Sequence, residues 1–206
     1  MALFAREFEC PSCGGRIKRE NAASKSLGCP YCGQTSHVSG DSLSMAGTPN
    51  LLIDYGSMFS VGMVATLRGR RFRVSGKLRI AYEDGFWDEW YIQFLDNNQD
   101  AWIQEDDGGF ILFEPATDYE RLSFHDIKVG GYYSFSNAYQ QVFVTSKSRA
   151  KVEGGEGELP FAIIPGDIAD FVEGVEDGKV ISMEILPKET HISVGTPFKL
   201  DEVSLN

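Results

Sequence analysis

Two pairs of cysteines near the N-terminus constrain most strongly what this chain can fold into. Cys10 and Cys13 form one C-x-x-C pair, Cys29 and Cys32 form a second, and fifteen residues separate the two pairs. Each pair offers two thiolates from one tight loop, so this spacing is typical of a tetrahedral zinc site with four thiolate ligands. A glycine follows each pair, and glycine adopts a left-handed backbone at little cost, which lets amide N–H groups point at the sulfurs.

We therefore predict a zinc ribbon over residues 1–37, with Zn²⁺ as a structural cofactor, because four thiolates leave no position for a catalytic water. The alternatives are two disulfides or a redox-active C-x-x-C. Reduced cytosolic thiols and the lack of a βαβ context favour zinc over both. His37 is a further candidate ligand, although a lone histidine in a polar loop is more often solvated. A segment this small buries little apolar area, so metal binding should supply most of its folding free energy.

The charge of the chain is unevenly distributed. The net charge is -11 over 206 residues, with 42% hydrophobic residues, as in an ordinary globular protein. Residues 1–33 carry five basic and three acidic residues, which leaves 14 basic and 27 acidic residues for the remainder. An acidic body is compatible with a basic protein partner or a polycationic ligand. The apolar runs are shorter than the roughly 20 residues of a membrane span, and no signal-peptide stretch is evident, so we expect a cytoplasmic protein.

The segment after the cysteines changes in composition. Residues 38–50 are rich in Ser, Gly, Asp, Thr and Pro, which predicts a linker over 38–54 and a separate body over 55–206. In the body, apolar and polar residues alternate, for example around Phe72, Leu78 and Trp90, which predicts about five antiparallel strands over 59–114. Further strands are predicted over 132–135, 141–145, 159–164, 180–186 and 189–193, and short helical turns near 116–122 and 166–171.

The two parts of the body resemble each other. Phe59-Ser60-Val61-Gly62 is similar to Ile127-Lys128-Val129-Gly130, and residues 72–77 are similar to residues 142–147, at offsets of 68 and 70 residues. This raises the hypothesis of two similar halves, 55–122 and 123–206, although ordinary strand and turn composition produces such similarity as well. The predicted fold class is mainly β, with a small zinc ribbon followed by a β-barrel-like or sandwich body.

Several glycines and aromatic residues resemble a known family. They are Val61-Gly62, residues 72–76, residues 87–91 (WDEWY), Trp102, Gly109-Phe110, residues 157–161 (GELPF) and Val194-Gly195. Over residues 55–203 the chain resembles the bacterial domain-of-unknown-function family 4178, in which a zinc ribbon sometimes precedes the domain. The resemblance implies no activity, because the family has none established.

No motif in the body indicates an enzyme. The sequence contains no G-x-S-x-G, no P-loop and no G-x-G-x-x-G, and all its cysteines belong to the predicted ribbon, so we expect a non-enzymatic protein. The first hypothesis is an adaptor or binding protein that contacts a protein partner through the ribbon and a sheet face. The second is nucleic-acid binding through the ribbon and the basic stretch Arg68–Arg79, which includes Arg71 and Arg73. The alternative for that stretch is a charge ladder that pairs with acidic residues of the neighbouring hairpin.

A third hypothesis is a small-molecule-binding or enzymatic β-barrel. Trp87, Trp90 and Trp102 lie on predicted neighbouring strands, where aromatic residues most often form core. Alternatively, some of them form a ligand platform flanked by Asp88 and Glu89. Aromatic faces beside carboxylates suit cationic ligands. These tryptophans and the two arginines, Arg71 and Arg73, are the candidate residues of a ligand or partner surface.

Overall fold

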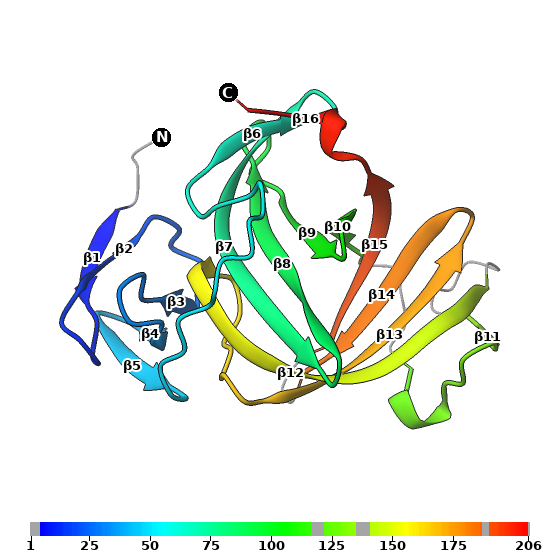
Figure 1. Ribbon diagram of the computed structural model, residues 1–206, viewed down its shortest axis with the longest axis horizontal. Coiled ribbons are helices and arrows are strands. Elements are labelled where there is room, and N and C mark those ends of the chain that lie inside the picture. Colours follow the sequence, from blue (N-terminus) through cyan, green and yellow to red (C-terminus); the bar gives the residue numbers. More distant parts are fainter. Residues whose placement is uncertain (1–4, 117–121, 135–140, 187–189, 206) are drawn as a thin grey trace.

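The computed structural model describes residues 5–116, 122–134, 141–186 and 190–205, which are almost entirely antiparallel strands (Figure 1). The N-terminal strands are β1 (Arg6–Glu9), β2 (Arg16–Arg19), β3 (Ser26–Gly28), β4 (Thr35–Ser39) and β5 (Ser42–Ala46). The body contains β6 (Val64–Leu67), β7 (Arg70–Tyr82), β8 (Gly85–Phe94), β9 (Asp100–Asp106), β10 (Gly109–Pro115), β11 (Tyr132–Tyr133), β12 (Val142–Leu159), β13 (Ile168–Glu176), β14 (Lys179–Ile185), β15 (Thr190–Phe198) and β16 (Val203–Leu205). Two short 3₁₀ helices, η1 (Phe124–Asp126) and η2 (Leu200–Glu202), complete the described elements. None of the helices in these ranges has the length and apolar character needed to cross a bilayer.

Eight strands of the body close into an antiparallel barrel. Their order is β7-β8-β9-β10-β15-β14-β13-β12, and the C-terminal half of β7 pairs with β12 to close the ring. The barrel therefore consists of two four-stranded meanders, β7–β10 and β12–β15, joined along β7–β12 and β10–β15. The predicted mainly-β fold with a barrel-like body is confirmed.

The two meanders share their local structure. The Gly62 N–H donates to the Val74 carbonyl at 2.8 Å, and the Gly130 N–H donates to the Val144 carbonyl at 2.9 Å. Both glycines have a left-handed backbone, with φ of 88° and 82°, and each meander's first strand has a register shift directly after its valine. The sequence similarity between residues 59–62 and 127–130 thus corresponds to equivalent hydrogen bonds in the two halves.

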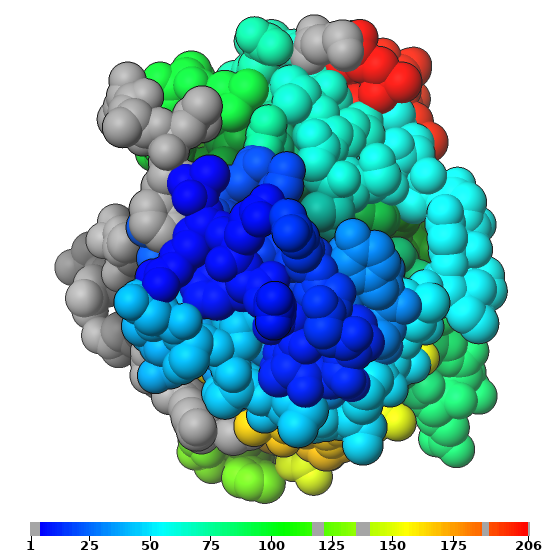
Figure 2. Space-filling view, turned by 90° about the vertical axis from the view of Figure 1, so that its left-hand side faces the viewer, coloured from blue at the N-terminus to red at the C-terminus, as the bar shows by residue number. Residues whose placement is uncertain are grey.

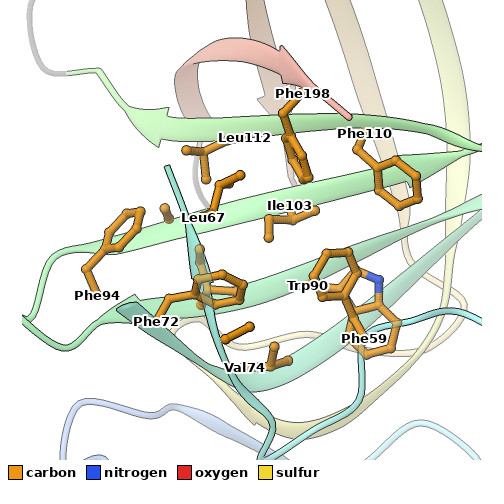
Figure 3. Close-up of a cluster of buried hydrophobic side chains, with 13 residues drawn as sticks. Phe59, Leu67, Phe72, Val74, Trp90, Phe94, Ile103, Phe110, Leu112 and Phe198 are labelled. Atoms are coloured by element: carbon orange, nitrogen blue, oxygen red, sulfur yellow. The ribbon is translucent and has the colours of Figure 1, made fainter. Parts of the chain in front are cut away.

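Alternate residues of the meanders point to two different cores. Trp87 on β8 contacts Phe171 on β13 with ring centroids 5.0 Å apart, although these strands are not neighbours in the sheet, so both side chains lie inside the barrel. The opposite face of the first meander forms a separate core around Phe59, Trp90 and Phe110, closed by β6 (Figure 3). The opposite face of the second meander packs against Ile127 in the same way. The barrel interior is therefore enclosed by two meanders that each have an outer core.

The N-terminal region is built into the sheet of the body. β3 pairs with the end of β12, and β4 and β5 extend the sheet from there. Figure 2 shows the N-terminal residues packed against the segment that follows them. Within the predicted linker 38–54, residues 42–46 form β5, which pairs along its whole length with β4. Backbone pairing of this kind needs few apolar side chains, so composition did not reveal it.

Two other segments differ from the predicted secondary structure. In the expected strand 159–164, only Leu159 belongs to a strand, and residues 160–164 are irregular while Phe161 and Ile163 are buried. The expected helical turn over 166–171 is wrong from Ile168 onward, where β13 begins and pairs with two neighbours. The helical turn expected near 116–122 lies largely outside the described residues.

Candidate metal centre and barrel cavity

The two cysteine loops have the same backbone geometry. The Gly14 N–H donates to the Cys10 carbonyl at 2.9 Å, and the Gly33 N–H donates to the Cys29 carbonyl at 3.0 Å. Gly14 and Gly33 have φ values of 74° and 70°, the left-handed conformation predicted from their place after each pair. One loop joins β1 to β2 and the other joins β3 to β4, so two hairpins bring the four thiols together.

The sulfur positions fit a four-thiolate metal site. The Sγ atoms of Cys10 and Cys32 are 3.7 Å apart, those of Cys13 and Cys29 are also 3.7 Å apart, and all four lie within 4.8 Å of one another. Tetrahedral coordination with metal–sulfur bonds of about 2.3 Å requires sulfur separations of about 3.8 Å. A disulfide needs about 2.05 Å, and all four cysteines are free. The four cysteines therefore have the geometry of a four-thiolate metal site and do not form two disulfides.

The environment affects the thiols unequally. Burial raises the pKa of the Cys29 thiol to about 12, whereas an amide hydrogen bond from Gln34 is the main cause that lowers the pKa of Cys32 to about 7. A bound cation deprotonates coordinating thiols, which removes this difference. His37 is not a ligand in this arrangement, because its Nε2 atom lies 2.8 Å from the carbonyl oxygen of Ile163.

The ribbon is attached to the barrel by polar contacts as well as strand pairing. The buried carboxylate of Glu158 on β12 accepts hydrogen bonds from the Glu20 N–H at 2.6 Å, the Asn21 N–H at 2.9 Å and the Ser24 hydroxyl at 2.7 Å. The Ser26 hydroxyl accepts from the Ile163 N–H at 3.1 Å, so β3 and β4 fix both backbone groups of Ile163. This fixes the segment that carries Phe161 into the barrel, where it contacts Trp102 and His191.

A cavity of about 220 Å³ lies between the two meanders. Side chains from β7, β8, β9, β12 and β13 line it, namely Tyr82, Trp87, Gln104, Asp106, Ser146, Ser148, Phe171 and Glu173. Trp87 and Phe171 are buried, whereas Tyr82, Asp106, Ser146 and Ser148 are exposed. The cavity therefore opens to solvent at the exposed residues and is deepest at the two buried aromatic rings.

Three glutamates lie together in the barrel interior. Glu89 is 6% exposed and pairs in register with Gln104, so it lies beside a lining residue of the cavity. Glu184 pairs in register with the lining residue Phe171 on one side and with His191 on the other. The Trp87 Nε1–H donates to Glu89 Oε1 at 2.8 Å, and the Ser146 hydroxyl donates to Glu173 at 3.3 Å. No residue in the described ranges donates a hydrogen bond to the other oxygen of Glu89.

Burial makes these three carboxyl groups difficult to ionise. Desolvation raises the pKa of Glu89 to about 7, against the favourable hydrogen bond from Trp87. Desolvation also raises the pKa of Glu184 well above its usual value, and the nearby Glu89 and Glu173 raise it further. The pKa of Glu173 is raised chiefly for the same reason. The interior thus holds three carboxyl groups for which burial favours the neutral form.

On the opposite face of the same strands, a buried carboxylate has two cationic partners. Arg79 forms two hydrogen bonds of 2.7 Å with Asp88, and Lys77 Nζ lies 2.9 Å from the same carboxylate, with all three side chains at most 7% exposed. The second meander repeats this arrangement, because Arg149 forms hydrogen bonds of 2.7 and 3.2 Å with Asp170 at a more exposed site.

The structure brings together only some of the candidate surface residues. Trp87 and Trp102 both face the barrel interior, whereas Trp90 is 3% exposed in the outer core, so it cannot form part of a ligand platform. Arg73 forms an ion pair with Glu20 of the ribbon, and Arg71 is exposed. The basic stretch does not form one exposed stripe, because Lys77 and Arg79 are buried with Asp88, and Arg68 and Arg70 pair with Glu202 and Glu114.

Residues 60–199 match the model of a family described as a domain of unknown function, DUF4178. The chain belongs to this family. The matched residues begin before β6 and run through β15, so they include the complete eight-stranded barrel and its cavity. No curated protein and no solved structure matches the chain. The four cysteines lie before the part that matches DUF4178.

Sequence reasoning identified Glu89 as a flanking residue but missed Glu173 and Glu184. On β14, Ser182 and Glu184 alternate with the buried Ile181 and Met183. Such alternation is also typical of a strand with one face in water, so it does not distinguish an interior glutamate from a solvated one. These glutamates become recognisable only once the sheet is known to close, because closure places a polar strand face inside the barrel.

Proposed function

We propose that this DUF4178 protein is a non-enzymatic binding protein whose barrel takes up a small molecule and whose ribbon contains a structural Zn²⁺. The observation that carries the proposal is the cavity between the meanders, where two aromatic rings of the interior core, Trp87 and Phe171, lie with the carboxyl group of Glu173 beside an opening to solvent. A concave site with apolar surfaces and a few convergent polar groups is what small-molecule binding requires.

In this proposal the ribbon supports the barrel. Cys10, Cys13, Cys29 and Cys32 provide the ligands, and bound Zn²⁺ supplies four metal–thiolate bonds that fix two hairpins. The hairpins in turn fix Ile163 and thereby position Phe161 against Trp102 in the barrel interior. A structural metal thus supports one side of the ligand-binding barrel.

The adaptor hypothesis is a second candidate, and one feature supports it. The segment between the ribbon and β6 exposes Leu51, Ile53 and Tyr55, with exposed fractions of 56%, 63% and 66%. Large apolar side chains close together on a surface are typical of protein contacts. The nucleic-acid hypothesis has less support, because the cations of the Arg68–Arg79 stretch are largely paired with carboxylates of the chain.

A ligand screen on the full-length, zinc-loaded protein tests the proposal. We expect members of a library of neutral, anionic and cationic small molecules to raise the melting temperature. Ser148→Trp, which places a large ring at the cavity mouth, should abolish the effect, and Ser204→Trp on the exposed end of β16 should leave it intact. If no compound stabilises the protein, or if Ser148→Trp binds every hit normally, the cavity is not a binding site.

A further inference from the structure

The barrel cavity has one sign of charge. Glu173 lines it, Asp106 lies at its mouth, and Glu89 and Glu184 stand directly beside its lining residues. No lysine, arginine or histidine is among the lining residues that the structure describes, and His191, which pairs in register with Glu184, does not line the cavity. A buried carboxylate without a cationic partner destabilises the fold. A positively charged ligand would supply the missing partner, and this pairing would favour its binding.

The arrangement suits an organic cation better than a metal ion. In the described ranges, only the four cysteines bring three or more ligand atoms within 4.8 Å of one another. The glutamates are therefore spread around the cavity and do not converge on a point of metal size. The rings of Tyr82, Trp87 and Phe171 provide faces and edges for an alkylammonium group and its carbon chain, because aromatic rings attract cations and bury apolar area.

Glu89 offers a free hydrogen-bond acceptor at this site. Its side chain is more than nine-tenths buried, Oε1 is fixed by the Trp87 indole, and Oε2 accepts no hydrogen bond from the rest of the described chain. Glu184 accepts none on either oxygen within the same ranges. A primary ammonium group has three N–H donors, so it can satisfy several of these oxygens at once.

We propose that the cavity binds a small primary amine in its protonated form, with the ammonium group between the Trp87 ring and the carboxylates of Glu89, Glu173 and Glu184. This inference rests on the proposed small-molecule function of the barrel. The volume of about 220 Å³ corresponds to about seven water molecules, which is the size of a short aliphatic amine. The amine is either a free compound or the side chain of a lysine residue, since both present the same head group.

Calorimetric titration of the full-length, zinc-loaded protein tests this inference with three probes of similar shape. We expect n-butylamine to bind, while n-butanol and butyrate bind at least about tenfold more weakly, because they lack the cationic donor. Glu89→Gln preserves the shape and the acceptor for Trp87 but removes the charge, and should weaken butylamine binding at least about tenfold. Asp201→Asn, at an exposed position on η2, is the matched control and should bind normally.

The outcomes separate this inference from the general one. If butanol or butyrate binds as tightly as butylamine, or if Glu89→Gln binds butylamine normally, the inference of amine recognition is wrong. If other classes of the library bind the cavity and no amine does, amine recognition fails while the ligand-binding function stands. If no compound binds, both fail. N-acetyl-lysine amide serves as a fourth probe, and its binding in place of butylamine would assign the head group to a lysine side chain.

Discussion

Glu89→Gln should make the unliganded protein more stable, although it alters a buried side chain. A carboxyl group whose pKa is higher in the folded chain stabilises the fold below its unfolded pKa, and this contribution is lost as the pH rises through the folded pKa. For Glu89 the pKa is about 7 in the folded protein against 4.5 for the free group, because the side chain is desolvated and faces Glu173. The free energy of unfolding of the wild type therefore falls between pH 4.5 and pH 8 as Glu89 ionises. The glutamine variant has no carboxyl group at this position and lacks this decrease.

The size of the effect follows from the difference between these two pKa values. Each pKa unit corresponds to about 1.4 kcal/mol, so the ionisation of Glu89 costs the folded state about 3 kcal/mol at pH 8 and about 1 kcal/mol at pH 5. Glutamine keeps the acceptor for the Trp87 indole, which leaves packing and hydrogen bonding nearly unchanged. For a chain of this length, about 3 kcal/mol corresponds to a rise in melting temperature of roughly 6–12 °C.

Urea unfolding of the zinc-loaded protein at pH 5, 6, 7 and 8 measures the difference directly. Comparing the variant with the wild type at each pH cancels the pH dependence of zinc binding and of groups that do not interact with Glu89. The titratable groups around the site are Glu173, Glu184, Asp88, Asp106 and His191. Glu89 raises the pKa of Glu184, so the loss of its charge lowers that pKa as well and stabilises the variant in the same direction. Asp201→Asn controls for the loss of one exposed negative charge and should change stability by less than about 0.5 kcal/mol at every pH. A Glu89→Gln variant that is less stable than the wild type at pH 8 would refute the argument.

Four further predictions concern the support of the site. Asp88→Asn leaves Lys77 and Arg79 buried without their carboxylate and should lower the free energy of unfolding in urea by about 3–5 kcal/mol. The equivalent Asp170→Asn at the more exposed pair should lower it by at most about 1 kcal/mol. Equal decreases would contradict the role of burial. Metal analysis should find one zinc per chain, and Cys13→Ser should reduce this content. Chelation should change tryptophan emission, because the freed ribbon no longer holds Phe161 against Trp102, and an unchanged spectrum would show that ribbon and barrel are independent. Gly28→Ala places a Cβ atom 2.3 Å from the Gly155 carbonyl oxygen, which should disrupt the pairing of β3 with β12. The ribbon should then become sensitive to limited proteolysis while its zinc content is retained. Full protection from the protease would show that β3 tolerates the methyl group.

The sequence was sufficient to predict features that depend on local spacing. The four metal ligands follow from two C-x-x-C pairs, since each loop needs only its own glycine to form, and Gly14 and Gly33 have the expected backbone. The strands around Phe72 and Trp90 follow from alternation, because a buried outer core requires apolar residues at every second position. The paired segments at 59–62 and 127–130 were also visible, because their glycines serve the same turn.

The features that were missed depend on how distant strands close. Alternation indicates that Ser182 and Glu184 lie on the same face of β14. It does not indicate whether that face is exposed to water or lies inside a barrel, because a polar face produces the same pattern in either environment. The tryptophans show the same difficulty. Trp87 and Trp90 are three residues apart and therefore lie on opposite faces of β8, one beside the cavity and one in the outer core. β5 was missed because its pairing with β4 uses backbone groups and hardly any apolar side chains.

Two adjacent acidic residues, Asp88 and Glu89, have opposite electrostatic environments, and this contrast supports the proposed ligand. Asp88 points to the outer face, where Arg79 and Lys77 give its carboxylate three charged hydrogen-bonding contacts within 2.9 Å. Glu89 points to the interior, where one indole N–H is its hydrogen-bond donor among the described residues and its charged neighbours are also acidic. The same hairpin thus neutralises one buried carboxylate fully and leaves the next one without a cation. Because the missing cation lowers stability above pH 7, the positively charged ligand that we propose would restore at this site what Arg79 and Lys77 provide to Asp88.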